Sequence, residues 1–399
     1  MLKSPWAVLL GCGIVAAFGA PLWWSAALAL LIRPLEQAFG WSRADISFAF
    51  TLTTLAAPLL APLAGVVIDR VNLRRLVLWF VLLQSLAVAA FSLISASLLT
   101  FYALCLALTA VSYGASLLSL SKIVQGWFDQ QRGRALGVLF ACASVGPIIH
   151  PLIAQGLLER LGLQQMFLVA GLGCGVVTVL AALLFVHVRP ASEPPLTAQL
   201  AAGEAPMASL SQLLRSRAFW TLALWCGFFI YGLSSITVHL PSLLQDRGGT
   251  PAQSAAAYSL IGVGLLIGNL VIGYLLDKVP AHWLASLVML GPLAGVAVLQ
   301  FCDPGFGPVA AVLFGLSAGG EGTLFAYLIG RYVAADLYGR AYGAQVVLVA
   351  LAAGLGPWLA GVMYGAYGGY TQVLALAAAM FVAAMAAAWA LPRVARDAG

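Results

Sequence analysis

The sequence predicts an all-α integral membrane protein, with 12 transmembrane helices in two pseudo-symmetric six-helix bundles. Three observations predict this class: an apolar composition, twelve apolar runs of spanning length, and a repeat that relates the two halves of the chain. Of the 399 residues, 62% are hydrophobic and only 8% are charged. A soluble protein of this length needs more polar residues to cover its surface, so the composition excludes a soluble globular protein.

Each predicted span is an apolar run close to or above the roughly 20 residues that a helix needs to cross the hydrocarbon core. The first run follows Lys3 and continues through Trp23 and Trp24 to Arg33 without a small-residue cleavage site. We therefore expect an uncleaved first span and not a signal peptide. The predicted spans cover residues 6–32, 46–68, 76–97, 99–122, 135–157, 166–188, 218–244, 253–276, 282–301, 306–330, 340–366 and 370–391.

One stretch has no spanning run. The segment RPASEPPLTAQLAAGEAPMASLSQLLRSR, from Arg189 to Arg217, holds four prolines and two acids, which is typical of a linker. It divides the chain into an N-terminal six-helix bundle (1–188), a cytoplasmic linker (189–217) and a C-terminal six-helix bundle (218–399).

Three short motifs occur once in each half, at offsets of 208, 206 and 210 residues. The nearly constant offset indicates duplicated halves, with a transport path between them. The matched positions are Gly65 and Asp69 of GVVIDR with Gly273 and Asp277 of GYLLDK, Gly133 of GRALG with Gly339 of GRAYG, and Pro147 with Pro357.

The basic residues predict the orientation in the membrane. If the N-terminus is cytoplasmic, only Arg33, Arg43, Arg160 and Arg247 of the 19 Lys and Arg residues fall on the outer side, and the remaining 15 fall inside. This positive-inside bias places both termini in the cytoplasm of a multi-pass protein of the bacterial inner membrane. The net charge of +6 is scattered over loops, so we expect no nucleic-acid partner.

Motifs for catalysis are missing from the sequence. The six cysteines stand singly, without CxxC or Cys/His spacing, so we expect neither disulfides nor a metal site. There is no HExxH, no GxSxG and no GxxxxGK[ST], which argues against an intramembrane enzyme or an ATP-driven pump and predicts no cofactor. A secondary transporter fits best, and a channel or a membrane receptor is the alternative from a different class.

The loop GVVIDRVNLRR closely resembles the loop between helices 2 and 3 of the major facilitator superfamily. Asn72 stands where the second glycine is usual, and Asn tolerates left-handed backbone. The resemblance implies the two-bundle fold and a cytoplasmic gate at this loop and its degenerate second copy, while an ordinary basic loop is the alternative. The gate residues expected are Gly65, Asp69, Arg70, Arg74, Arg75, Arg134, Asp277, Lys278, Arg331 and Arg340.

Four further stretches resemble bacterial members of the monocarboxylate and oxalate/formate branch: FGWSRADIS, WFDQQRGRALG, HLPSLLQDRGGTPAQSAA and EGTLFAYLIGRYVAADLYGRAYG. The resemblance implies proton-coupled symport of a small organic anion by a monomer, with efflux of an amphipathic compound as the alternative. One position departs from the branch. Asn269 stands where an arginine often binds the substrate carboxylate, so the anion site would need Asn269, a histidine or helix-end dipoles.

Glu321 is an acid inside the apolar, glycine-rich run FGLSAGGEGTLFAYLIGRYV. A charge at this depth is costly, so such residues face a wet cavity or a partner, or carry a proton. The functional interpretation is proton coupling or substrate binding. The structural one is a carboxylate bonded to a neighbouring helix or paired with Arg331. Gly319, Gly320 and Gly322 allow a close helix approach or a bend.

Five other residues are candidates for the substrate or proton path. His239 ends span 7 near the outer face, as an outer-gate residue or an interfacial histidine. His150 lies in VGPIIHPLI of span 5, where a broken helix could bind ligand or the ring could bond a freed carbonyl. Lys122 lines the cavity or snorkels to the headgroups, and Tyr113 and Tyr327 shape the cavity wall or pack in the core.

Overall fold

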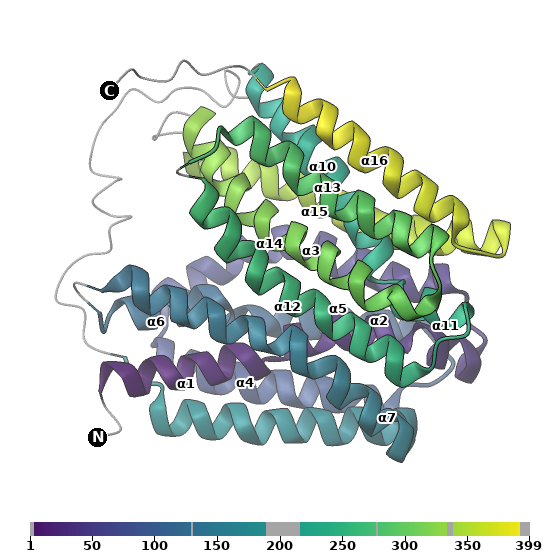
Figure 1. Ribbon diagram of the computed structural model, residues 1–399. Coiled ribbons are helices and arrows are strands. Elements are labelled where there is room, and N and C mark those ends of the chain that lie inside the picture. The colour runs from purple at the N-terminus through teal and green to yellow at the C-terminus, as the bar shows by residue number, and fades with distance from the viewer. Residues whose placement is uncertain (1–3, 129–130, 189–215, 277, 333–337, 392–399) are drawn as a thin grey trace, which may run out of the picture.

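The computed structural model describes residues 4–128, 131–188, 216–276, 278–332 and 338–391, and every regular element in this part of the chain is a helix (Figure 1). The predicted linker lies outside the described residues except for its last two positions. The exact limits of the two bundles, 1–188 and 218–399, therefore stay a prediction.

The first half of the chain consists of eight helical elements. Two of the predicted spans, the first and the fourth, are each interrupted, at Gly19 and at the short helix η2. The elements are α1 (Pro5–Phe18), α2 (Ala20–Phe39), α3 (Arg43–Arg70), α4 (Leu73–Ala90) with η1 (Phe91–Leu93), α5 (Leu98–Ser112) with η2 (Tyr113–Ala115), α6 (Leu117–Gln125) and α7 (Arg132–Phe185).

Helix α7 contains two spans. Gly162 breaks it with φ 76° and ψ 177°, a left-handed conformation that glycine adopts without a Cβ penalty. Figure 1 shows the two arms running back along each other from this corner. The predicted spans 135–157 and 166–188 correspond to these arms.

The second half continues with α10 (Arg217–Thr237), α11 (Leu240–Asp246), α12 (Pro251–Leu275), α13 (Ala281–Phe301), η3 (Pro304–Phe306), α14 (Gly307–Tyr332), α15 (Tyr338–Tyr367) and α16 (Thr371–Trp389). Among the described residues, 10 helical stretches are long and apolar enough to cross a membrane. Counting the two arms of α7 separately and adding the interrupted α1–α2 gives twelve crossings, the predicted number.

The internal repeat is visible in how helices begin. Helix α3 starts with a capping box in which Ser42 and Asp45 bond each other's backbone N–H, and α12 starts with the same device from Thr250 and Gln253. A capping box satisfies two of the N–H groups that a helix start leaves open. The two boxes are 208 residues apart, the offset of the GVVIDR and GYLLDK motifs, so the duplication extends over the whole of this span.

The halves meet through two helix pairs that the repeat exchanges. Helix α3 packs on α15, and the first arm of α7 packs on α12. Because the repeat relates α3 to α12 and the first arm of α7 to α15, one contact is the pseudo-symmetric counterpart of the other. This is the arrangement expected of two related bundles around a common axis.

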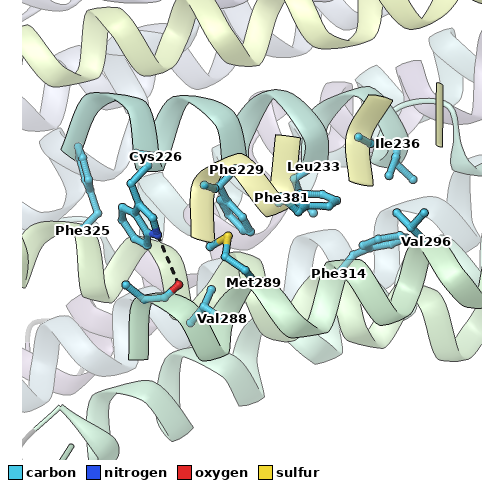
Figure 2. Close-up of a cluster of buried hydrophobic side chains, with 14 of the residues drawn as sticks. Cys226, Phe229, Leu233, Ile236, Val288, Met289, Val296, Phe314, Phe325 and Phe381 are labelled. Carbon is cyan, nitrogen blue, oxygen red and sulfur yellow. Dashed lines mark hydrogen bonds between the residues drawn. The ribbon is translucent and has the colours of Figure 1, made fainter. Parts of the chain in front are cut away.

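Each half has its own buried core. One cluster uses residues 219–391 alone, and two others use residues 8–186 together with Val238 and Ala255. Figure 2 shows the cluster of the second half, where Phe229 and Phe381 lie beside Met289 and Cys226 marks one end. Separate cores let each bundle move as a body while the contacts between them change.

Candidate functional site

A buried ion pair joins the two halves of the chain. The guanidinium of Arg43, on α3, binds both carboxylate oxygens of Asp246, the last residue of α11, with N–O distances of 2.6 and 3.0 Å. Its Nε donates to Glu36 on α2 at 3.0 Å, and its Cζ lies 3.9 Å from the centre of the Tyr364 ring. Only 5% of Arg43 is exposed. Bidentate, charge-assisted hydrogen bonds of this kind are stronger than neutral ones.

His239 extends the same network deeper into the molecule. Its ring is fully buried at the junction of α10 and α11. Nε2 lies 2.9 Å from the carbonyl oxygen of Pro357 and 3.0 Å from the hydroxyl of Ser47 on α3. Nδ1 lies 3.0 Å from the hydroxyl of Tyr370, which accepts a hydrogen bond from Arg43 at 2.8 Å. A continuous polar network therefore runs from Glu36 to Pro357.

We call this cluster the Arg43 gate. It unites residues from α2 and α3 with residues from α10–α11 and α15–α16, which are distant in sequence. Its members are Arg33, Glu36, Arg43, Ser47, His239, Asp246, Pro357 and Tyr370.

Below the Arg43 gate, α3 and α15 stay in direct contact. The Thr51 hydroxyl donates to the carbonyl oxygen of Gly354 at 2.6 Å, and the Phe48 and Trp358 rings lie 5.7 Å apart. The two halves are thus sealed together along the N-terminal part of α3.

At the opposite end, the described contacts of the predicted cytoplasmic gate stay within one half. Arg74 donates to the carbonyl of Leu183 at 3.1 Å, and Lys278 bonds the hydroxyl of Tyr274 on its own helix. Near this end of α3, Leu63 is 65% exposed. Arg70, Arg75 and Arg134 are exposed as well. Asp277 and the side chains of Gly65, Asp69, Arg331 and Arg340 lie outside what the structure describes, so the predicted Glu321–Arg331 pair and the full gate stay predictions.

Glu321 is buried in α14, with 7% of its surface exposed. Its Oε1 accepts a hydrogen bond from the Cys226 thiol of α10 at 2.8 Å. Among the described side chains it forms no ion pair. A thiol is a weak donor, so this partner compensates little for the burial of a carboxylate. The arrangement suits an acid that binds and releases a proton.

The glycines around Glu321 form a close seam between α14 and α12. Gly315 and Gly319 face Gly264 and Gly268 with the same four-residue spacing on each helix. A Cβ atom on Gly319 would lie 2.8 Å from the backbone nitrogen of Asn269 and nearer still to another backbone atom of α12. The seam explains most of the glycine content that the sequence shows before Glu321, because small residues let helix backbones touch.

A family model described as Major Facilitator Superfamily matches residues 9–357, most of the chain. The chain belongs to the major facilitator superfamily. It is therefore a multi-pass membrane protein and a secondary transporter of a small-molecule substrate, and not an enzyme, as the sequence predicted.

Known relatives of this transporter include carriers of carboxylates. It is 28% identical to the 3-(3-hydroxy-phenyl)propionate transporter of Escherichia coli over 86% of this chain and 84% of the relative. It is 24% identical to monocarboxylate transporter 4 of Rattus norvegicus, over 95% of this chain and 82% of the relative.

Solved structures match the fold over nearly the full length. A bacterial homologue of the human lysosomal transporter Spinster, in an inward-facing and occupied conformation, superposes with a TM-score of 0.70 at 16% identity, covering 96% of this chain and 94% of that chain. The nucleoside transporter NupG superposes with a TM-score of 0.72 at 14% identity, covering 96% and 98%.

The other predicted site residues of the transporter lie in separate places. His150 is buried on α7, with its ring 5.9 Å from that of Phe18 at the break in the first span. Asn269 is exposed on α12, and its side chain donates to the carbonyl of Leu265 on the same helix at 3.0 Å. The structure does not gather these residues around Glu321.

Three further candidates lie on spans 4 and 10 of the transporter. The Tyr113 hydroxyl donates to the carbonyl of Ala57 at 2.7 Å and so joins the break in span 4 to α3. Lys122 is half-buried on α6, and Tyr327 is 36% exposed on α14. Among the described residues, no cluster of three or more His, Cys, Asp or Glu could hold a metal ion.

Sequence reasoning missed the centre of the Arg43 gate. Arg43 served only as an orientation signal, and Asp246 was not a candidate, although both lie in stretches that carry the branch resemblance, FGWSRADIS and HLPSLLQDRGG. One opposite pair at the outer ends of spans 2 and 7 was the available signal. Cys226 was also missed, because an isolated cysteine in an apolar run has the appearance of a core residue.

Proposed function

We propose that this transporter moves a small organic anion, of the monocarboxylate type, together with a proton by alternating access. The observation that carries the proposal is Glu321, a carboxylate buried in α14 whose described hydrogen-bond partner is a thiol. Ionisable residues within membrane spans mark substrate or proton paths. A carboxylate without a strong partner binds a proton when its chamber opens to an acidic side.

The relatives support an anion as substrate, because two of them are named for carboxylates. Asn269 in place of an arginine means that the carboxylate is held by amide, hydroxyl or helix-end donors. The competing proposal, efflux of an amphipathic compound, draws on the scarcity of charge, since only 8% of the residues are charged.

The distribution of basic residues supports an orientation with both termini in the cytoplasm of the bacterial inner membrane. In that orientation the Arg43 gate faces outward and Arg74 faces inward. We propose that the described contacts represent a state that is closed to the outside, with two monomer bundles, 1–188 and 218–399, joined by the linker 189–217.

The test is uptake into proteoliposomes under an imposed pH gradient. A panel of aliphatic and aromatic monocarboxylates is compared with lipophilic cations, in liposomes with and without an inwardly directed proton gradient. Gradient-driven, saturable accumulation of a carboxylate supports the proposal. Accumulation of the cations against an opposing proton gradient would support efflux instead, and fluxes that do not saturate would indicate a channel.

A further inference from the structure

The hydrogen bonds around His239 have a fixed direction. The Pro357 carbonyl oxygen can only accept, so Nε2 of His239 must carry a proton to bond it at 2.9 Å. The Arg43 guanidinium can only donate, so the Tyr370 oxygen accepts from it at 2.8 Å. The hydroxyl proton of Tyr370 is then directed to Nδ1 of His239, 3.0 Å away, which must accept.

This direction makes the closed Arg43 gate specific for neutral His239. A proton on Nδ1 would face the Tyr370 oxygen, whose own proton points the same way. A charged imidazolium would also lie next to the Arg43 guanidinium in a site without water, since His239 is 0% exposed. Burying two like charges at this separation is unfavourable.

The other neighbours do not offset that charge. Ser47 and Pro357, on the Nε2 side, are neutral. On the Nδ1 side, the two oxygens of Asp246 are both occupied by Arg43, which also binds Glu36. Further groups around Arg43 add one cation and one neutral phenol: Arg33, whose Nε lies 3.7 Å from Asp246, and Tyr364.

We infer that His239 is a positioning residue for closure of the Arg43 gate, and that protonation of His239 from the side on which this gate opens holds the gate open. The inference goes beyond the proposed function, because it needs only the alternating access of the superfamily and neither Glu321 nor an anionic substrate. The gate closes once His239 has lost its second proton.

The size of the effect follows from linkage. In the open gate a water-exposed histidine titrates near its ordinary pKa of about 6.5, and the closed gate excludes the proton. The ratio of open to closed molecules should then be about tenfold larger at a pH of about 5.5 than at about 7.5. The closed state is favoured at high pH and lost as the pH falls.

The experiment measures the opening directly by double electron–electron resonance. Spin labels are placed on exposed positions of the two halves at this end, with Gln37→Cys on α2 and Gln372→Cys on α16, in a Cys302→Ser background. The labelled Cys302→Ser protein without the two new cysteines corrects for the partly buried native ones. Detergent-solubilised full-length protein is measured at the two pH values.

We expect the long-distance population to grow about tenfold at the acidic pH in the parent protein. His239→Gln keeps an amide N–H for Pro357 and an oxygen near Tyr370 but does not titrate, so it should stay closed at both pH values. His187→Gln, which changes a histidine whose Nδ1 contacts Phe185 away from the gate, should respond like the parent. A pH response that persists in His239→Gln, or that disappears in His187→Gln, would overturn the inference.

A measurement on the parent protein covers the case in which His239→Gln does not fold. The chain has 4 histidines, so selective ¹⁵N-histidine labelling gives a short spectrum. One ring should be a neutral Nε2–H tautomer at the higher pH and should become protonated together with the growth of the long distance. Distances that stay short while every resolved ring titrates would contradict the inference.

Discussion

Arg43 and Asp246 lie 203 residues apart in the sequence and form a bidentate ion pair that ties α3 to α11 across the two halves of the transporter. Both residues come from stretches next to capped helix starts, so their backbones are held in place by local structure. The pair is the point at which movement of one bundle against the other must break a strong contact.

Replacing Asp246 by Asn should weaken the closed state. The change removes the negative charge that Arg43 binds with two hydrogen bonds, and loss of one partner of a largely buried pair costs about 3 kcal/mol. We expect a lower melting temperature and slower transport. Thermal unfolding and initial rates of uptake check both effects.

The control for the Arg43–Asp246 pair is Arg160→Gln, which removes an exposed cation predicted to lie on the same side of the membrane. It should change the free energy of unfolding by less than about 0.5 kcal/mol. The double variant with Arg43→Asp and Asp246→Arg should recover part of the lost stability. Equal stability of Asp246→Asn and the parent would contradict the role given to the pair.

Replacing Glu321 by Gln should uncouple transport from the proton gradient. The amide oxygen still accepts from the Cys226 thiol, so the packing is kept while the proton-binding group is lost. We expect pH-driven accumulation to disappear and counterflow exchange to continue. Glu159→Gln, an exposed carboxylate on α7, serves as the control and should leave accumulation unchanged. Unfolding of Glu321→Gln would instead support a structural carboxylate.

Replacing Gly319 by Ala should disturb the seam between α12 and α14. The new methyl group would press against the α12 backbone at Asn269, which cannot give way as a side chain does. Overpacking of this kind costs about 1–3 kcal/mol. Gly322→Ala is the matched control, because a Cβ there meets nothing within 4 Å. Similar melting temperatures for the two variants would argue against the seam.

Replacing Asn269 by Arg should change the substrate preference if this face of α12 lines the anion path. A guanidinium binds a carboxylate with charge-assisted hydrogen bonds worth about 1.5–3 kcal/mol, so the half-saturating carboxylate concentration should fall about tenfold or more. Competition uptake with the carboxylate panel measures this, and Asn269→Gln is the neutral control. Unchanged preference in Asn269→Arg would remove this position from the site.

The sequence by itself determined the membrane fold of this protein. Partition between water and lipid depends on short apolar runs, so the spans could be predicted without tertiary structure, and the offset shared by Gly65 and Gly273 predicted two related bundles. The breaks at Gly19 and Gly162 could be placed only approximately, because glycine permits a break without requiring one.

Tertiary structure alone decided which residues meet. The thiol of Cys226 reaches Glu321, and His239 reaches Ser47 and Tyr370, through the rotation of each helix about its axis and through packing between distant segments. An apolar helix surrounded by lipid and protein shows little periodicity that fixes this rotation. For this physical reason the sequence could nominate His239 and Glu321 as candidates, while the Arg43–Asp246 pair became visible only when the two halves were folded together.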